Sequence, residues 1–129
     1  MLHPELTPDG VGLPGDDRPG AGHWVATTPE LGLIGVVSVM PEAVPWDPQT
    51  GEAWRLRGMA TAPEARGWGV GADLVARVLE HARAQKGRIL WCTARMGAVG
   101  FYQRQGFTTW GETWDEPVIG THIHMLRPL

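Results

Sequence analysis

Residues 1–129 are long enough for one packed domain and too short for two ordinary ones. Hydrophobic residues at 43% and charged residues at 19% exclude a disordered chain, and no apolar run approaches the roughly 20 residues of a membrane span. The net charge of −3 conceals a basic part, residues 54–129, which suits a polyanionic ligand or an ordinary charged surface but lacks the basic runs of nucleic-acid-binding proteins.

The start of the chain carries no targeting signal that we can identify. Residues 1–5 lack a basic segment followed by an apolar core, so no secretory signal is expected. The single cysteine, Cys92, is predicted to pack as a small hydrophobic residue in a strand, which is consistent with a cytoplasmic protein. Eight of residues 1–20 are proline or glycine, so this lead segment is predicted to be a loop.

The next part of the chain is rich in β-forming residues. Residues 23–28 and 33–40 are predicted to form a hairpin around a short turn that contains proline and glycine. A proline-rich loop over residues 41–51 then leads to a strand over residues 53–61.

The pattern changes to a helix over residues 69–85. Apolar side chains recur at steps of three and four, and charged side chains cover the opposite face. Gly87 is expected to end this helix, and residues 88–93 form the next strand. Strand, helix and strand within about 40 residues predict a right-handed βαβ unit with parallel strands. The apolar stripe of the helix consists of Val70, Leu74, Val75, Val78, Leu79 and Ala82.

The last part of the chain is predicted to be a short helix followed by a hairpin. The helix covers residues 97–105, and the two strands cover residues 107–112 and 119–126. The side chains that this helix is expected to bury are Ala98, Phe101 and Tyr102. These elements predict an α+β fold, with a mixed, mostly antiparallel twisted sheet around a central parallel βαβ unit.

The turn before the long helix has the composition of an anion-binding site. Gly67, Gly69 and Gly71 stand at every second position, so the main chain can turn tightly and approach a ligand closely. The amides that open a helix lack intrahelical acceptors, and the helix dipole favours a negative charge beside them. The turn therefore predicts a cradle for a diphosphate, with a plain tight turn as the alternative.

Two common phosphate-binding families do not fit this turn. A P-loop is excluded because no Gly-Lys-Ser/Thr follows it. A dinucleotide-binding fold needs the spacing Gly-x-Gly-x-x-Gly and an acidic residue after the next strand, where this chain has Arg95.

Two segments resemble the GNAT superfamily of acyl-CoA-dependent N-acyltransferases. Residues 66–71 match its Arg/Gln-x-x-Gly-x-Gly/Ala signature, and residues 98–107, with an aromatic-Tyr pair before Gly-Phe, resemble its second segment. The tail, with Gly-Glu at 111–112, His122 and Met125, is similar to the ending of a bacterial subgroup. The resemblance covers roughly residues 22–129, and both segments stand on the expected elements.

The resemblance implies that acetyl-CoA is the co-substrate, without a metal. Its pyrophosphate would lie on the turn, and its pantetheine arm would lie along the strand before the turn, in a wedge between two splayed parallel strands. The implied cofactor-binding residues are Met59, Ala60, Thr61, Arg66, Gly67, Trp68, Gly69, Val70, Gly71, Ala72, Thr93 and Tyr102. Thr93 stands where relatives often have an asparagine.

The implied reaction is acetyl transfer to a primary amine of a small molecule or peptide, by direct attack in a ternary complex. Tyr102 occupies the position of the family's tyrosine that faces the CoA sulfur and is the candidate general acid. Many relatives carry a glutamate base on the strand before the turn, where this chain has Arg57. Glu112 and His122 are the remaining candidate bases.

Two alternatives remain from other classes: a catalytically silent acyl-CoA-binding module and a purely structural domain. Family members commonly begin with a strand and one or two helices, which the first 22 residues of this chain leave reduced or missing. An open sheet edge there predicts a homodimer. The tryptophans at positions 46, 54, 110 and 114 could wall an acceptor site or pack in the core.

Overall fold

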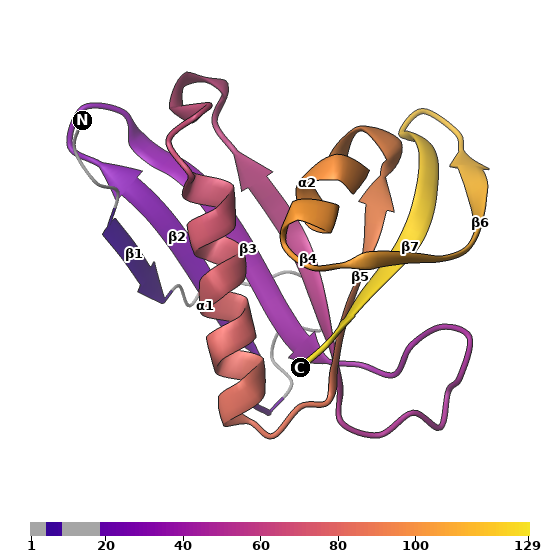
Figure 1. Cartoon of the computed structure of the whole chain (residues 1–129). Helices are drawn as coiled ribbons and strands as arrows, with labels where there is room; N and C mark the ends of the chain where they lie inside the picture. The colour runs from indigo at the N-terminus through magenta and orange to yellow at the C-terminus, as the bar shows by residue number, and fades with distance from the viewer. Residues whose placement is uncertain (1–4, 9–18) are drawn as a thin grey trace.

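The computed structural model describes residues 5–8 and 19–129, which form one seven-stranded sheet with two helices on one face. The strand order is β1-β2-β3-β4-β5-β7-β6. Every neighbouring pair is antiparallel except β4 and β5, which are parallel. Figure 1 shows α1 in front of β2 and β3, and α2 on the same side, in front of the second half of the sheet. The helix α1 also contacts β4. The bounds are β1 Glu5–Pro8, β2 Gly22–Thr28, β3 Gly32–Pro41, β4 Ala53–Thr61, η1 Pro63–Ala65, α1 Val70–Ala84, β5 Ile89–Arg95, η2 Met96–Ala98, α2 Val99–Arg104, β6 Thr108–Glu116 and β7 Gly120–Pro128.

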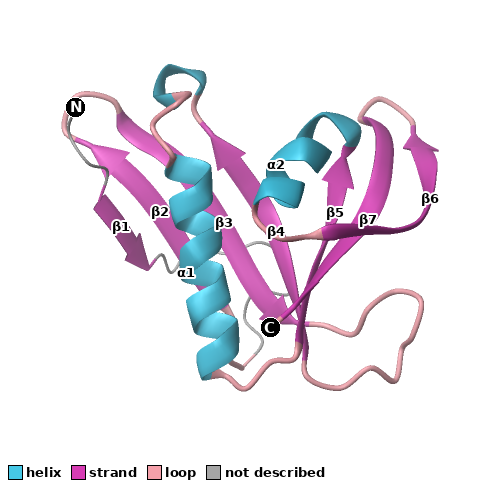
Figure 2. Cartoon of the chain, in the orientation of Figure 1, coloured by secondary structure: helices cyan, strands magenta, loops and turns pink. Residues whose placement is uncertain are grey.

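The predicted α+β class and the central parallel βαβ unit are confirmed. The strand β4 covers residues 53–61, as predicted, and α1 starts and ends within one residue of the predicted helix (Figure 2). The hairpin of β2 and β3 and the loop after it also form where they were expected. The short second helix is divided into the 3-10 turn η2 and α2.

The prediction that residues 1–20 form only a loop is wrong at Glu5–Pro8. These residues make β1, antiparallel to β2, with Glu5 opposite Thr27 and Pro8 opposite Trp24. Proline is tolerated there because an edge strand does not need every N–H for a ladder bond. The N-terminal strand is therefore reduced rather than missing, and it covers the sheet edge that was expected to be open. The prediction that the N-terminal helices are reduced or missing also concerns residues 9–18, which lie outside the described residues.

The C-terminal hairpin is longer than its sequence indicates. The segment 113–116, predicted to be a connection, is part of β6. The register shifts between Trp110 and Trp114, which lie opposite His124 and His122. A bulge therefore accommodates the extra residues of β6, and the strand continues beyond it.

The helix α1 ends in a different way from the one predicted. The left-handed residue is Lys86, with φ of 64°, and not Gly87. The amide of Lys86 donates to the carbonyl of Arg83 (2.9 Å), and that of Gly87 to the carbonyl of Ala82 (2.8 Å), which is a Schellman motif. A Cβ on Gly87 would lie 2.6 Å from Cδ1 of Trp54, so the glycine is needed for close packing rather than for its φ.

The core lies between the sheet and the two helices. All six residues of the predicted apolar stripe are buried on α1. From β5 they meet Leu90, Cys92 and Ala94, whereas Trp91 points to the opposite face and joins a smaller cluster with Val44 and Ala53. Because side chains alternate along a strand, β5 separates an apolar core from a second face with different chemistry.

Candidate functional site

The site begins where the two parallel strands part. Hydrogen-bonded pairing of β4 with β5 covers three residue pairs and ends at Arg55 opposite Trp91. Beyond that point β4 continues to Thr61 and β5 to Arg95, and Figure 1 shows the two strands diverging. Relative to β3, β4 has one extra residue between Arg57 and Ala60, where Gly58 has φ of 67°. Such a bulge increases the local twist and turns β4 away from β5.

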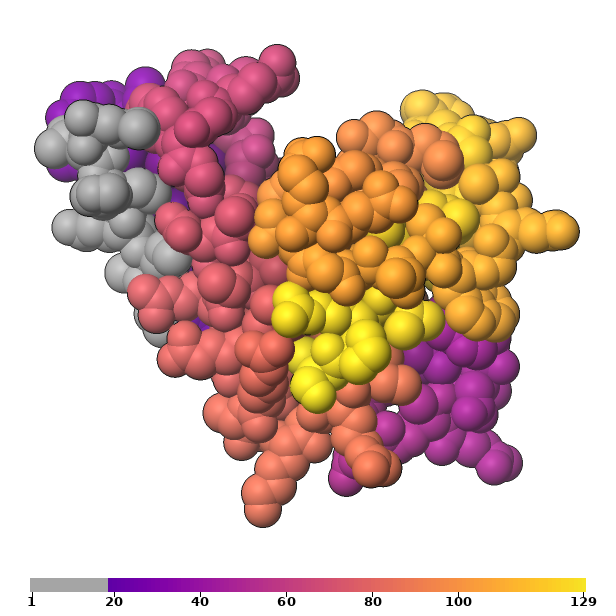
Figure 3. All heavy atoms as spheres, in the orientation of Figure 1, coloured from indigo at the N-terminus to yellow at the C-terminus, as the bar shows by residue number. Residues whose placement is uncertain are grey.

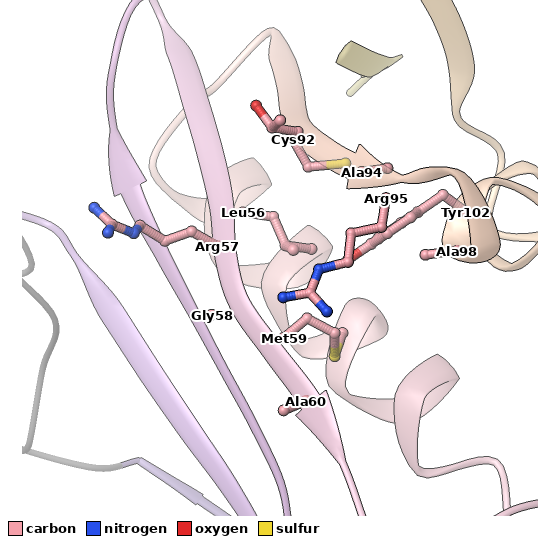
Figure 4. A pocket seen from close by; sticks show the side chains of 11 residues that line it. Leu56, Arg57, Gly58, Met59, Ala60, Cys92, Ala94, Arg95, Ala98 and Tyr102 are labelled. Atoms are coloured by element: carbon pink, nitrogen blue, oxygen red, sulfur yellow. The ribbon is translucent and has the colours of Figure 1, made fainter. Parts of the chain in front are cut away.

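Two adjoining cavities fill the wedge between the diverging strands. One has a volume of about 420 Å³ and the other about 430 Å³, and they share Met59, Ala60, Ala98 and Tyr102. The first is lined by consecutive residues of both strands: 56–60 of β4 and 92–95 of β5. In Figure 4, Met59 and Ala60 lie across the gap from Ala98 and Tyr102. The second cavity extends to Arg66 and Gly71 at the turn, where Figure 3 shows a notch between the turn and α2.

The glycine turn borders this second cavity through Arg66 and Gly71. Gly67 and Gly69 have φ of 85° and 78°, and a Cβ on either would meet nothing within 4 Å. The amides of Arg66 and Trp68 donate to the carbonyls of Pro63 and Ala65, each at a distance of 3.1 Å. Over this stretch of the described chain, no acceptor lies within hydrogen-bond distance of the remaining amides. These are the amides of Gly67, Gly69, Val70, Gly71 and Ala72.

Tyr102 lies where the two cavities meet. Its ring is held edge-on between Phe101 and Phe107, at centroid distances of 5.1 and 5.4 Å. The side chain is 6% exposed and lines both cavities, and no partner for its hydroxyl occurs among the residues that the structure describes. Burial, with a smaller effect of Cys92, raises the pKa of the phenol, so it is a proton donor at neutral pH.

Cys92 lines the first cavity but is not a nucleophile at neutral pH. Burial raises the pKa of its thiol to about 12, and the nearby Arg55 offsets only part of this rise. The thiolate is the reactive form of cysteine, so a buried thiol with a raised pKa is inert. Cys92 is a small buried residue of β5, as predicted.

Comparison with known proteins identifies the family. The family described as acetyltransferase (GNAT) domain matches residues 19–109, well over half of the chain. The chain belongs to the GNAT acetyltransferase family.

Several known acetyltransferases are similar to this GNAT protein. The uncharacterized N-acetyltransferase YitI of Bacillus subtilis (strain 168) is 38% identical over 98 residues, which are 75% of this chain and 64% of YitI. The chain thus spans less than two thirds of that relative. The crystal structure of nourseothricin acetyltransferase has a TM-score of 0.69 at 27% identity, covering 85% of this chain and 66% of that one. A GNAT acetyltransferase from Elizabethkingia anophelis with acetyl-CoA bound shares the fold over 100% of both chains, with a TM-score of 0.70 at 18% identity.

Neither of the two candidate bases of this GNAT protein lines a wedge cavity. Glu112 is exposed in the bulge of β6. His122 is buried, with Nδ1 2.9 Å from the carbonyl oxygen of Gly120 and its ring stacked on Trp114 at 6.0 Å. Neither residue lines either cavity, whereas Thr93 lines the first. The structure therefore brings Tyr102 and Thr93 to the wedge and leaves Glu112 and His122 outside it.

His124 lines neither cavity, but it contacts Thr93, which lines the first, and the sequence did not indicate this contact. Its Nδ1 lies 3.2 Å from Oγ1 of Thr93, the residue opposite it in the β5–β7 register. Burial and, to a smaller extent, Arg55 lower the pKa of this imidazole. The spacing of His122 and His124 indicates that they share one face of a strand, but the sequence does not indicate which residues of the neighbouring strand lie opposite them.

The tryptophans pack against one another and against the core. Trp54 is buried beneath Gly87, Trp46 stacks on Trp110 at a centroid distance of 3.9 Å, and Trp114 lies 4.5 Å from His124. None of these four lines either of the two wedge cavities. An acceptor wall made of tryptophans therefore has no support in the wedge itself.

Neither a metal cluster nor a spanning helix occurs within residues 5–8 and 19–129. No group of three or more His, Cys, Asp and Glu side chains there is arranged to hold a metal ion. No helix in the same residues is long and apolar enough to cross a membrane.

Proposed function

We propose that this protein transfers an acetyl group from acetyl-CoA to a primary amine of a small molecule or peptide, by direct attack in a ternary complex. The observation that carries the proposal is the row of five amides without acceptors, at the start of α1, beside a cavity that leads to Tyr102. A helix start of this kind favours a phosphate group.

The residues present fit coenzyme A along the whole wedge. The pyrophosphate would be held by the amides of Gly67 and of residues 69–72, with Arg66 beside it. Trp68 would contribute its ring rather than its amide, because the amide already donates to Ala65. The pantetheine arm would lie along Met59, Ala60 and Thr61, because in the described part of the chain the ladder between β4 and β5 ends at Arg55. Thr93 would contact it from β5.

Acetyl-CoA supplies an acyl group on a thioester, whose sulfur leaves as a thiolate. We infer that Tyr102 protonates that sulfur; the inference is supported by its phenol, which keeps its proton at neutral pH and lines both cavities. The first cavity is also lined by Arg57 and Arg95, and no carboxylate of the described residues lines it. An acceptor that carries a carboxylate would therefore be favoured over one with a second cationic group.

A catalytically silent acyl-CoA-binding module is the second candidate. It is favoured by Arg57, which stands where a carboxylate base is common, and by Glu112 and His122, neither of which lines a wedge cavity. The two candidates differ in whether thiol is released. Release of free thiol from acetyl-CoA in the presence of an amine panel supports the transferase, and acetyl-CoA binding by calorimetry without release supports the silent module. Failure to bind acetyl-CoA contradicts both and leaves a structural domain.

We also propose that the protein is a cytoplasmic homodimer that binds neither nucleic acid nor a membrane. The argument from an open edge beside β2 no longer holds, since β1 covers that edge. The other sheet edge is β6, and Val118 and Ile119 expose apolar surface beside it. Light scattering at tens of micromolar decides the oligomeric state, and a monomer contradicts the proposal.

A further inference from the structure

The wedge cavity reaches both faces of β5. Residues 92–95 of that strand all line it, although successive side chains of a strand point to opposite faces. Cys92 and Ala94 point to the helical face, where Tyr102 lies. Thr93 lies in register with His124, on the face that carries Trp91. A substrate in the gap therefore has one face toward Tyr102 and the other toward Thr93.

The surroundings of His124 hold its ring in one place. Trp46, Trp91 and Trp114 surround it, with ring centroids 5.6, 6.0 and 4.5 Å away. These contacts come from the loop after β3, from β5 and from β6, so the imidazole is fixed from three sides. Its Nδ1 is thereby directed to the hydroxyl of Thr93.

The charged groups near His124 favour its neutral form. Arg55 of β4 lies over the ring of Trp91 at 4.9 Å and forms an ion pair with Glu42 at 2.9 Å. His122, two residues earlier on β7, and Arg95, which lies opposite His122 on β5, are further titratable groups on this face. Burial and, to a smaller extent, Arg55 lower the pKa of His124, so the imidazole is neutral near pH 7 and can accept a proton.

We propose that Thr93 and His124 form the proton-accepting pair for the acceptor amine, with Thr93 in contact with the amine and His124 acting through it. This inference rests on the proposed acetyl transfer. His122 does not take this role, because its Nδ1 is directed to the carbonyl of Gly120 and not to Thr93. This pair would take the role of the carboxylate base that many relatives carry on the strand before the turn, where this chain has Arg57.

The step balances with the groups named. One ammonium proton moves to Oγ1 of Thr93 as the hydroxyl proton of Thr93 moves to Nδ1 of His124. The amine nitrogen then forms the bond to the acetyl carbon, the carbon–sulfur bond breaks, and the sulfur takes the proton of Tyr102. The surplus proton of the new amide restores the phenol of Tyr102, and His124 releases its proton to water. The products are the amide, free CoA and one proton.

The test compares the variants His124→Gln and Thr93→Val with the wild type across pH. Turnover at neutral pH is expected to fall by about 100-fold in each, and His124→Gln is expected to keep the acetyl-CoA affinity within about twofold of wild type. The loss is expected to shrink as the pH approaches the amine pKa of about 10.4, since the amine is then already neutral. A purely structural role would instead lower turnover equally at every pH, which contradicts the proposal.

The chain offers a matched control pair. His23 and Ser38 form the same cross-strand contact, with Nδ1 2.9 Å from Oγ, and neither lines the wedge cavities. His23→Gln is therefore expected to keep the wild-type pH profile. If the wild type releases thiol and His124→Gln releases it with an unaltered rate and pH profile, the proton route is wrong, whereas the proposed acetyl transfer still holds. Acetyl-CoA binding without any thiol release by the wild type overturns both.

A second readout needs no turnover. In the free protein, NMR titration of the His124 ring is expected to give a pKa below the ordinary value of 6.5. The substitution Thr93→Val is expected to shift that titration, because it removes the hydroxyl on Nδ1. A His124 titration at or above 6.5, or one that ignores Thr93→Val, overturns the inference.

Discussion

The parallel strands β4 and β5 are paired in one half and separated in the other. From Ala53 to Arg55 they are joined by a ladder, and Trp54 and Leu90 are buried under α1. Beyond Arg55 the bulge at Gly58 turns β4 away, and two cavities lie where a ladder would continue. The same two strands thus build the core in one half and the candidate site in the other. Stability and chemistry can therefore be altered separately along one strand pair.

The largest expected effect lies in the paired half. Trp54→Ala removes a buried indole that is 6% exposed, and it should lower the free energy of unfolding by about 3–5 kcal/mol. Urea unfolding measures this loss. Trp110→Ala is the control, because its indole is 41% exposed and should lose clearly less. Equal losses in both variants would mean that the paired half is not the centre of stability.

The next effect lies in the separated half. Tyr102→Phe should lower turnover at least about tenfold, because the proton donor to the sulfur is removed. The free energy of unfolding and the affinity for acetyl-CoA should stay near wild type, since the ring packing on Phe101 and Phe107 is kept. Thiol release and calorimetry measure the two quantities. Unchanged turnover would remove Tyr102 from the mechanism.

The turn is tested by a substitution at its left-handed glycine. Gly69→Val places a β-branched residue at φ of 78°, which strains the main chain that presents the amides. Binding of acetyl-CoA should weaken by about tenfold, as measured by calorimetry. Gly51→Val is the matched control, because a Cβ there meets nothing within 4 Å and Gly51 lines neither wedge cavity. Equal affinity of the two variants would contradict the cradle.

The smallest effect is a pH dependence of stability. The pKa of His124 is lower in the folded protein than the ordinary value of 6.5, so the unfolded chain binds more protons between these two values. The contribution of the neutral imidazole is present above pH 6.5 and is lost as the pH falls through the folded pKa. Urea unfolding at a series of pH values should show a shallower acid loss in His124→Gln than in the wild type. Identical slopes would show that His124 does not titrate abnormally.

Local patterns predicted the elements of the separated half well. The strand β4, the glycine turn and the stripe of α1 were each predicted from a few neighbouring residues, since alternation, φ freedom and helical spacing are local properties. Tyr102 was identified only through the resemblance of its segment to a family. The strand β1 was missed because its proline content counted against it, although an adjacent edge was available for pairing.

The sequence by itself determined the order of the elements from β2 onward, the parallel βαβ unit and the family. Only the tertiary structure decided that Gly87 makes room for Trp54, that β4 and β5 part at Arg55, and that Thr93 lies opposite His124 rather than His122. The physical reason is that helical spacing and turn chemistry depend on residues close in the chain. Strand register and close packing depend instead on residues about 30 positions apart, whose meeting is decided by the whole sheet.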